Sequence, residues 1–172
     1  LLLYVFSIHA QNSGKIISKI GNPKIGRDNS FIYYPPGHSA NPEKIYASIV
    51  YENITGNHQK LIAAKKIKSG YEFLVKGLDK ASTVIIAITD SANNIIDNNS
   101  DIGYTVFLQN KNGTISGSAY ISAAKLLNFS ALKSLKLDIN KISNQIISYY
   151  EKGYKISPNL SKEPSYKDYL NF

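Results

Sequence analysis

The chain has 172 residues and contains no cysteine, which excludes disulfides, thiolate nucleophiles and cysteine-ligated metals. Its length allows one well-packed domain, or one domain with a helical appendage. The formal net charge is +8, but Arg27 is the only arginine among the 20 basic residues. Because arginine is the preferred residue for reading base edges and for bidentate phosphate contacts, we expect no nucleic-acid partner.

The N-terminal segment, residues 1–10 (LLLYVFSIHA), is an uncharged apolar run that ends in the small residue Ala10 and precedes polar residues. This order is typical of the end of a secretory signal peptide, and the run is too short to span a bilayer as a helix. We therefore predict a signal-peptide remnant at 1–10, a mature chain that begins near Gln11, and export to the periplasm or cell envelope without a stable membrane anchor. The basic start of a signal peptide is missing, so we expect the natural chain to begin further upstream. The alternative interpretation is a buried first strand.

Short strands are predicted over the next part of the chain, separated by turns rich in glycine, proline and asparagine. Their number and regular spacing are the signature of an antiparallel sandwich. We therefore predict a β-rich protein, with an all-β immunoglobulin-like sandwich over residues 11–112. The predicted strands are 15–20, 31–34, 44–52, 59–67, one that contains Tyr71, Phe73 and Val75 on its inward face, 83–89 and 103–108.

Alternation assigns both faces of two of these strands. Strand 83–89 is β-branched almost throughout and apolar on both faces, so we expect it to be central. The lysines at 65–68 are instead typical of a solvated strand face or edge. The alternating residues are Ile45, Ala47, Ile49 and Tyr51 against Tyr46, Ser48 and Val50 in strand 44–52, and Val84, Ile86 and Ile88 against Ile85 and Ala87 in strand 83–89.

Helical periodicity replaces the strand pattern in residues 113–172, so we predict C-terminal α-helices and an α+β fold overall. One short helix is predicted over 118–127. A longer one begins after Asp138, whose carboxylate can accept from free N–H groups of the first turn. Gly153 is expected to weaken its last turn, and Ser157 and Pro158 to end it. Its apolar stripe consists of Ile139, Ile142, Ile146, Tyr149, Tyr150 and Tyr154.

The end of the chain carries apolar and aromatic residues without an evident cover. We predict that they form an exposed patch, because such patches on globular domains usually mark interfaces. The expected partner is another protein or a downstream domain, and self-association is also possible. The predicted interface consists of Tyr166, Tyr169, Leu170 and Phe172.

Several phrases together resemble the N-terminal region of exported bacterial thioredoxin-like proteins. These phrases are TVIIAITD (83–90), NNIIDNN (93–99), GYTVFL (103–108) and YYEKGYKISP (149–158). The last one also resembles the second helix of a tetratricopeptide unit, which commonly closes with a proline. The resemblance implies an immunoglobulin-like domain, a helical-repeat segment and a C-terminal thioredoxin domain. No Cys-x-x-Cys occurs here, so none of the family's redox residues can be transferred to this chain.

The resemblance implies a non-catalytic accessory or docking region of an exported thiol-disulfide oxidoreductase. The redox domain would then lie beyond the end of this chain, and the present segment would position or dimerise its parent. The alternative is a free-standing extracytoplasmic module that binds a glycan or an envelope protein. A downstream Cys-x-x-Cys distinguishes the first interpretation from the second. We expect this segment to have no enzymatic activity and to bind no cofactor.

Candidate metal ligands are few and scattered. His9 falls in the predicted signal peptide, His38 in a proline-rich loop and His58 in a hairpin loop. Because a zinc site needs roughly three or four protein ligands, we expect these to be solvated loop histidines. An oxygen-rich stretch suits calcium by ligand type but lacks the spacing of an EF-hand loop, and its residues are also common in turns. That stretch contains Asp90, Asn93, Asn94, Asp97, Asn98, Asn99 and Asp101.

Tyrosines provide the remaining candidates. Tyr104 follows an Asp-Ile-Gly sequence, which suggests a tyrosine corner in which the hydroxyl bonds back to the backbone. Four others can form an aromatic platform for a sugar or a partner strand, although tyrosine is also common inside sandwiches. These four are Tyr33, Tyr34, Tyr46 and Tyr51.

Overall fold

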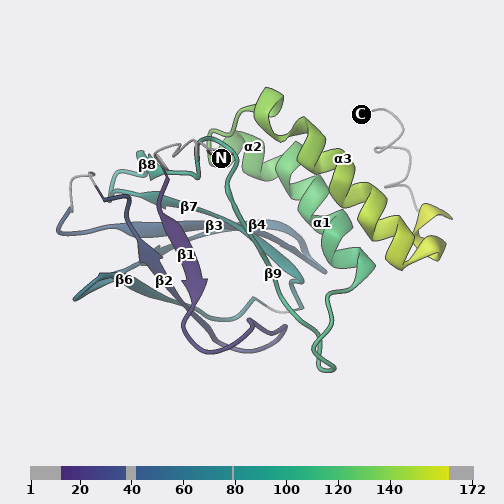
Figure 1. Cartoon of the computed structure of the whole chain (residues 1–172), viewed down its shortest axis with the longest axis horizontal. Coiled ribbons are helices and arrows are strands. Elements are labelled where there is room, and N and C mark those ends of the chain that lie inside the picture. Colours follow the sequence, from purple (N-terminus) through teal and green to yellow (C-terminus); the bar gives the residue numbers. More distant parts are fainter. Residues whose placement is uncertain (1–12, 38–41, 79, 163–172) are drawn as a thin grey trace, which may run out of the picture.

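The computed structural model describes residues 13–37, 42–78 and 80–162. They form a β-rich α+β fold in which two antiparallel sheets share one core and helices cover the outer face of one sheet (Figure 1). The predicted signal segment 1–10 and the predicted interface at Tyr166, Tyr169, Leu170 and Phe172 lie outside the described residues.

The first sheet has four strands in the order β1-β2-β6-β5. Phe31 pairs with Phe73 across β2 and β6, and their rings stack with centroids 5.7 Å apart. Lys65 and Lys66 are exposed on β5 at one edge, as the lysine cluster predicted. The strands are β1 (Lys15–Ser18), β2 (Asn29–Tyr34), β5 (Lys65–Ile67) and β6 (Gly70–Val75).

The second sheet has five strands in the order β4-β3-β7-β8, with β9 also paired to β7. Strand β7 lies between β3 and the pair β8 and β9, so the prediction of a central strand at 83–89 is confirmed. The strands are β3 (Tyr46–Asn53), β4 (Gly56–Ala63), β7 (Thr83–Thr89), β8 (Ile95–Asp97) and β9 (Tyr104–Phe107).

Strand β7 is buried along its whole length. Val84, Ile86 and Ile88 belong to the core between the sheets, whereas Ile85 and Ala87 pack under the helices. Both faces therefore lose contact with water, which is why this strand is an almost continuous apolar run. The predicted faces of β3 are also confirmed, because Ile49 lies in the core between the sheets and Val50 lies under the helices. The predicted inward direction of Tyr71, Phe73 and Val75 is confirmed as well, because all three lie in the core between the sheets.

The helical layer contains α1 (Gly117–Asn128), α2 (Ser130–Ser134), α3 (Ile139–Ile156) and the 3₁₀ turn η1 (Pro158–Lys162). Helix α1 packs on β7, and α3 packs on α1 as the outermost helix (Figure 1). The hydroxyl of Thr83 on β7 donates a 2.7 Å bond to the carbonyl of Ala119, which ties the sheet to α1. The second sheet and the helices also share one apolar layer, to which Val50, Ile85 and Ile146 belong.

Helix α3 begins and ends where its sequence predicts. The carboxylate of Asp138 accepts a 3.0 Å bond from the N–H of Asn140, and the helix stops before Ser157 and Pro158. Ile142, Ile146 and Tyr150 are fully buried against α1, but Ile139 at the first turn is 38 % exposed. The predicted stripe is thus confirmed except at its start.

Segment 59–67 differs from the prediction of a single strand. It contains the end of β4 and all of β5, which belong to different sheets. The N–H of Ala64 still bonds the carbonyl of Ile45 on β3, whereas Lys65 pairs with Glu72 on β6. The chain therefore crosses between the sheets at Ala64 without a glycine or proline to mark the crossing.

Strand β8 was not predicted, because its three residues are too few to show alternation.

Candidate functional site

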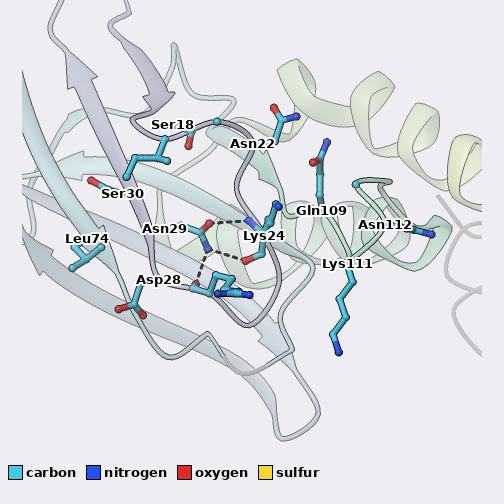
Figure 2. Close-up of a pocket in the computed structure, with 14 residues that line it drawn as sticks. Ser18, Asn22, Lys24, Asp28, Asn29, Ser30, Leu74, Gln109, Lys111 and Asn112 are labelled. Atoms are coloured by element: carbon cyan, nitrogen blue, oxygen red, sulfur yellow. Dashed lines mark hydrogen bonds between the residues drawn. The ribbon is translucent and has the colours of Figure 1, made fainter.

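A groove of about 970 Å³ lies at one end of the sheets. Residues of the β1–β2 loop and Leu74 of β6 line it, together with the segment after β9 (Figure 2). Figure 2 shows Gln109, Lys111 and Asn112 on one side of the groove, and Ser30 and Leu74 on the other. Two segments that are far apart in the sequence thus form one concave surface.

Asn29 shapes the loop that borders this groove. Its side chain is 7 % exposed and accepts a 2.8 Å bond from the N–H of Lys24. Its amide nitrogen donates to the carbonyls of Lys24 and Arg27 at 3.0 and 2.9 Å (Figure 2). The loop is also joined to the segment after β9, since Gln109 exchanges backbone bonds with Pro23 and Ile25. The groove walls are therefore held by hydrogen bonds before any ligand arrives.

The lining of the groove is polar and positively charged. Lys24, Arg27 and Lys111 contribute cations, and Asp28 is the one acid among the described lining residues. Asp28 has a 4.0 Å contact with Lys76, but both side chains are exposed, so this pair contributes little to stability. Together with the amides and hydroxyls of the lining, this charge suits an anionic or polar ligand.

A second polar cluster lies inside the protein around the carboxylate of Asp97, which is 8 % exposed. Its Oδ2 accepts from the hydroxyls of Tyr33 and Tyr104 at 2.8 and 2.7 Å and from the N–H of Gly14 at 2.7 Å. Its Oδ1 accepts from the N–H of Asn99 at 2.9 Å. Four donors therefore satisfy one buried carboxylate, as burial of a charge requires.

The same cluster changes the acidity of both phenols. Burial, and next the hydrogen bond to the Asp97 carboxylate, raise the pKa of Tyr33 and of Tyr104 well above the ordinary value of 10.0. Both hydroxyls consequently stay protonated donors at any physiological pH. The predicted tyrosine corner at Tyr104 is wrong, because its hydroxyl donates to the side-chain carboxylate of Asp97 and not to a backbone carbonyl.

The oxygen-rich stretch 90–101 is divided among separate networks. Asp90 closes a turn by accepting from Ala92 and Asn94, and the bonds from Asn94 chiefly lower the pKa of Asp90. Asp101 pairs with the Lys141 ammonium at 2.6 Å, which lowers the pKa of Asp101 and raises that of Lys141. No group of three or more histidine and acidic side chains suited to a metal occurs in the described part of the chain.

The turn residues of this stretch have the backbone that their composition favours. Asn93, Asn99, Ser100 and Asp101 all have positive φ, between 56° and 71°. Asparagine and aspartate tolerate this left-handed region better than other side chains. Apart from strand β8, the stretch therefore forms turns, and its three carboxylates, those of Asp90, Asp97 and Asp101, accept bonds from nearby donors.

Of the three candidate histidines, the structure describes only His58. Its ring stacks on Tyr51 with centroids 5.3 Å apart, and its Nε2 lies 2.8 Å from the Thr55 hydroxyl and 2.9 Å from Asn53 Oδ1. His9 and His38 lie outside the described residues. His58 therefore helps to order the β3–β4 hairpin.

The four tyrosines suggested as an aromatic platform do not lie on one surface. Tyr33 and Tyr51 are buried between the sheets, and Tyr34 and Tyr46 are half-buried on different sheets. Two of the four are therefore core residues, and the hydroxyl of Tyr33 is bonded to Asp97.

Sequence reasoning missed the groove and the Asp97 cluster. Turn residues such as Gly26 and Gly113, both with positive φ, mark the two groove loops separately. Nothing in the sequence indicates that these loops meet, because they are far apart along the chain and their backbone bonds, such as those of Gln109 with Pro23 and Ile25, exist only in the folded protein. The sequence likewise shows Asp97 only as one of several turn-type residues.

Comparison of the chain with models of protein families, with curated proteins and with solved structures finds no match. Among the described residues, no helix has the length and apolar character needed to cross a membrane.

Proposed function

We propose that this chain is a non-catalytic accessory or docking region of an exported thioredoxin-like thiol-disulfide oxidoreductase, built on an immunoglobulin-like fold. Its redox domain would lie beyond Phe172. The single observation that carries the proposal is the order of the strands, because it is the order expected of an immunoglobulin-like sandwich, an architecture common in cell-surface domains.

The strand order supports the immunoglobulin-like part of the proposal. With β1, β2, β5 and β6 as strands A, B, D and E, the first sheet has the order A-B-E-D. With β3, β4, β7 and β9 as C, C′, F and G, the second sheet has the order C′-C-F-G. The chain adds β8 to the F–G connection and lays its helices on the outer face of the second sheet.

The use of the polar side chains supports a non-catalytic role. The carboxylates of Asp97 and Asp101 are bonded to tyrosines, to backbone N–H groups or to a lysine. A general base needs a free lone pair within reach of a substrate proton. The described acids of the 90–101 stretch instead stabilise turns (Asp90), the contact between the two sheets (Asp97) and the contact with α3 (Asp101).

The helical layer is the proposed docking side. Helix α3 is held to α1 by its buried stripe, and its exposed apolar side chains are Ile139 and Ile156 at its two ends, which are 38 % and 47 % exposed. The predicted patch at Tyr166, Tyr169, Leu170 and Phe172 follows directly in the sequence. A partner or downstream domain bound there would be linked rigidly to the sheets through α1.

The coding sequence downstream of Phe172 tests the parent. A thioredoxin-like sequence with Cys-x-x-Cys is the expected result. A stop codon, or a second strand-rich domain without cysteines, would overturn the proposal and favour the free-standing module.

Removal of the tail tests the docking side. A chain that ends at Pro158 should keep the far-ultraviolet circular dichroism of the full chain but show less self-association in light scattering at matched concentration. If both chains are equally monomeric, and Tyr169 is as shielded from solvent as Tyr150, the tail belongs to a closed domain.

The groove favours the alternative function, an extracytoplasmic module that binds a glycan or an envelope protein. Its volume and its lining of cations, amides and hydroxyls fit an anionic sugar better than a neutral one, because the described lining has no aromatic ring for stacking. Titration with a sulfated oligosaccharide, using Lys111→Ala against Lys133→Ala on the distant α2, measures this directly. Equal affinities of the two variants would remove the groove from consideration.

A further inference from the structure

The most open sheet edge in the described part of the chain belongs to β4. This strand has eight residues and pairs only with β3. The edge strands β1 and β5 have four and three residues, and β5 carries Lys65 and Lys66. Short edge strands and lysine side chains both hinder the addition of another strand, and β4 is not short.

The register shows which backbone groups of β4 point away from the sheet. The N–H of Ala64 bonds the carbonyl of Ile45 at 3.0 Å, and the pairing continues without a shift to Asn53 and Gly56. Hydrogen-bonded pairs alternate in an antiparallel ladder, so the even-numbered residues of β4 bond to β3. The outward N–H and C=O groups are those of Asn57, Gln59, Leu61 and Ala63.

The side chains next to this edge differ between the two faces of the sheet. Lys60 lies on the face toward the other sheet, where its Nζ bonds the carbonyls of Lys76 and Gly77 at 3.2 and 3.1 Å. Leu61 lies on the opposite face and is 47 % exposed. An added strand would therefore meet a cation on one face and an aliphatic side chain on the other.

The charge near this edge distinguishes two candidate partners, a second copy of the chain and a foreign acidic strand. Lys60 lies on the edge strand itself, exposed Lys65 and Lys66 follow it in the sequence, and the whole chain carries +8. Two copies would bring these charges together, whereas an acidic strand would neutralise them. The observations therefore favour a foreign, negatively charged segment over a second copy.

We propose that the β4 edge binds an extended segment of a partner polypeptide in which acidic residues alternate with apolar ones. The segment adds a sixth strand to the second sheet through main-chain hydrogen bonds, its apolar side chains cover Leu61, and its carboxylates lie beside Lys60. This binding does not depend on the accessory role, because it uses main-chain groups of β4 and none of the residues of α3 or the predicted C-terminal patch.

Amide hydrogen exchange of the full chain tests the proposal, with a capped peptide of alternating valine and glutamate as the probe. Saturating peptide should slow exchange at Asn57, Gln59, Leu61 and Ala63 by about tenfold or more, while the even-numbered amides are slow with or without it. A peptide of alternating valine and lysine should have no effect. Loss of this difference between the two peptides would overturn the charge argument.

Gln59→Pro supplies the matched perturbation. It removes one outward N–H at a position where an edge strand tolerates proline, whereas Gln59→Ala keeps the N–H and serves as control. The proline variant should bind the valine–glutamate peptide at least about tenfold more weakly than the alanine variant. If the proline variant is unfolded, the same peptide N-methylated at alternate residues replaces it and should fail to bind the unaltered chain.

Two results would overturn the proposal outright. One is the absence of any slowing at the outward amides with millimolar valine–glutamate peptide. The other is protection of those amides in the free protein, with exchange that becomes slower as the protein concentration rises. The edge would then be occupied by a second copy.

Discussion

The hydroxyl of Tyr33 on β2 donates a 2.8 Å hydrogen bond to the carboxylate of Asp97 on β8, across the interior between the two sheets. Tyr104 of β9 and the backbone of Gly14 donate to the same oxygen. One buried oxygen thus connects both sheets and the segment before β1. The cluster connects several elements of the fold, and its loss should destabilise all of them together.

The first prediction concerns this cluster. Asp97→Asn should lower the free energy of unfolding by about 3 kcal/mol, because it replaces charge-assisted bonds and turns an amide N–H₂ toward donors. Asp28→Asn, at an exposed acid 4.0 Å from Lys76, should change it by less than about 0.5 kcal/mol. Urea unfolding of both variants measures the difference. Equal urea midpoints for the two variants would show that the buried carboxylate of Asp97 stabilises the fold no more than the exposed one of Asp28.

The second prediction concerns alkaline pH. The pKa values of Tyr33 and Tyr104 are raised in the folded state, so their contribution to stability is complete below pH 10 and is lost as pH rises above it. The loss should be about 1.4 kcal/mol per pH unit for each phenol. Tyr33→Phe or Tyr104→Phe should flatten this decline in urea melts between pH 9 and 11, relative to Tyr34→Phe at a half-buried position. Identical slopes in all three variants would contradict the raised pKa values.

The parts of the fold that were predictable are those set by local patterns. Alternation in 44–52 and 83–89 assigned the faces of β3 and β7, because each face of a strand has its own environment. Asp138 marked the start of α3 and Ser157 its end, since caps act within one turn. Such signals need no knowledge of the rest of the chain.

The parts that were not predictable depend on residues brought together from distant segments. The Asp97 cluster joins four segments, and the groove joins the loops of Lys24 and Lys111. The crossing at Ala64 was missed because residues 59–67 contain no turn residue, and the sequence does not show that their two halves pair in different sheets. Tertiary pairing decides these features, and a single sequence does not encode it in local form.

The third prediction follows from the central position of β7. Ile86→Ala should cost about 2–5 kcal/mol, because Ile86 is fully buried between the sheets and its truncation leaves a cavity. Lys66→Ala on the exposed edge strand β5 should be near neutral. A comparison of the two in urea melts checks the register of the sheets. Similar losses at both positions would contradict it.

The fourth prediction concerns Gly153, near the end of α3. A Cβ placed there would lie 2.6 Å from Cγ1 of Ile121 and 2.9 Å from the carbonyl oxygen of Gly117. The glycine therefore allows α3 to approach the start of α1 closely, and its weakening of the last turn is secondary. In an open helix, replacing glycine with alanine stabilises by about 1 kcal/mol through helix propensity.

At this contact the steric cost should exceed that gain. Gly153→Ala should destabilise the protein by about 1–3 kcal/mol, because backbone atoms of α1 cannot move aside as a side-chain tip can. Ser148→Ala on the exposed side of the same helix should leave stability unchanged or slightly higher. Thermal melts followed at the helical circular dichroism signal compare the two. A melting temperature for Gly153→Ala equal to or above that of the unaltered chain would show that the helices are free to separate, and that α3 is not held rigidly on α1.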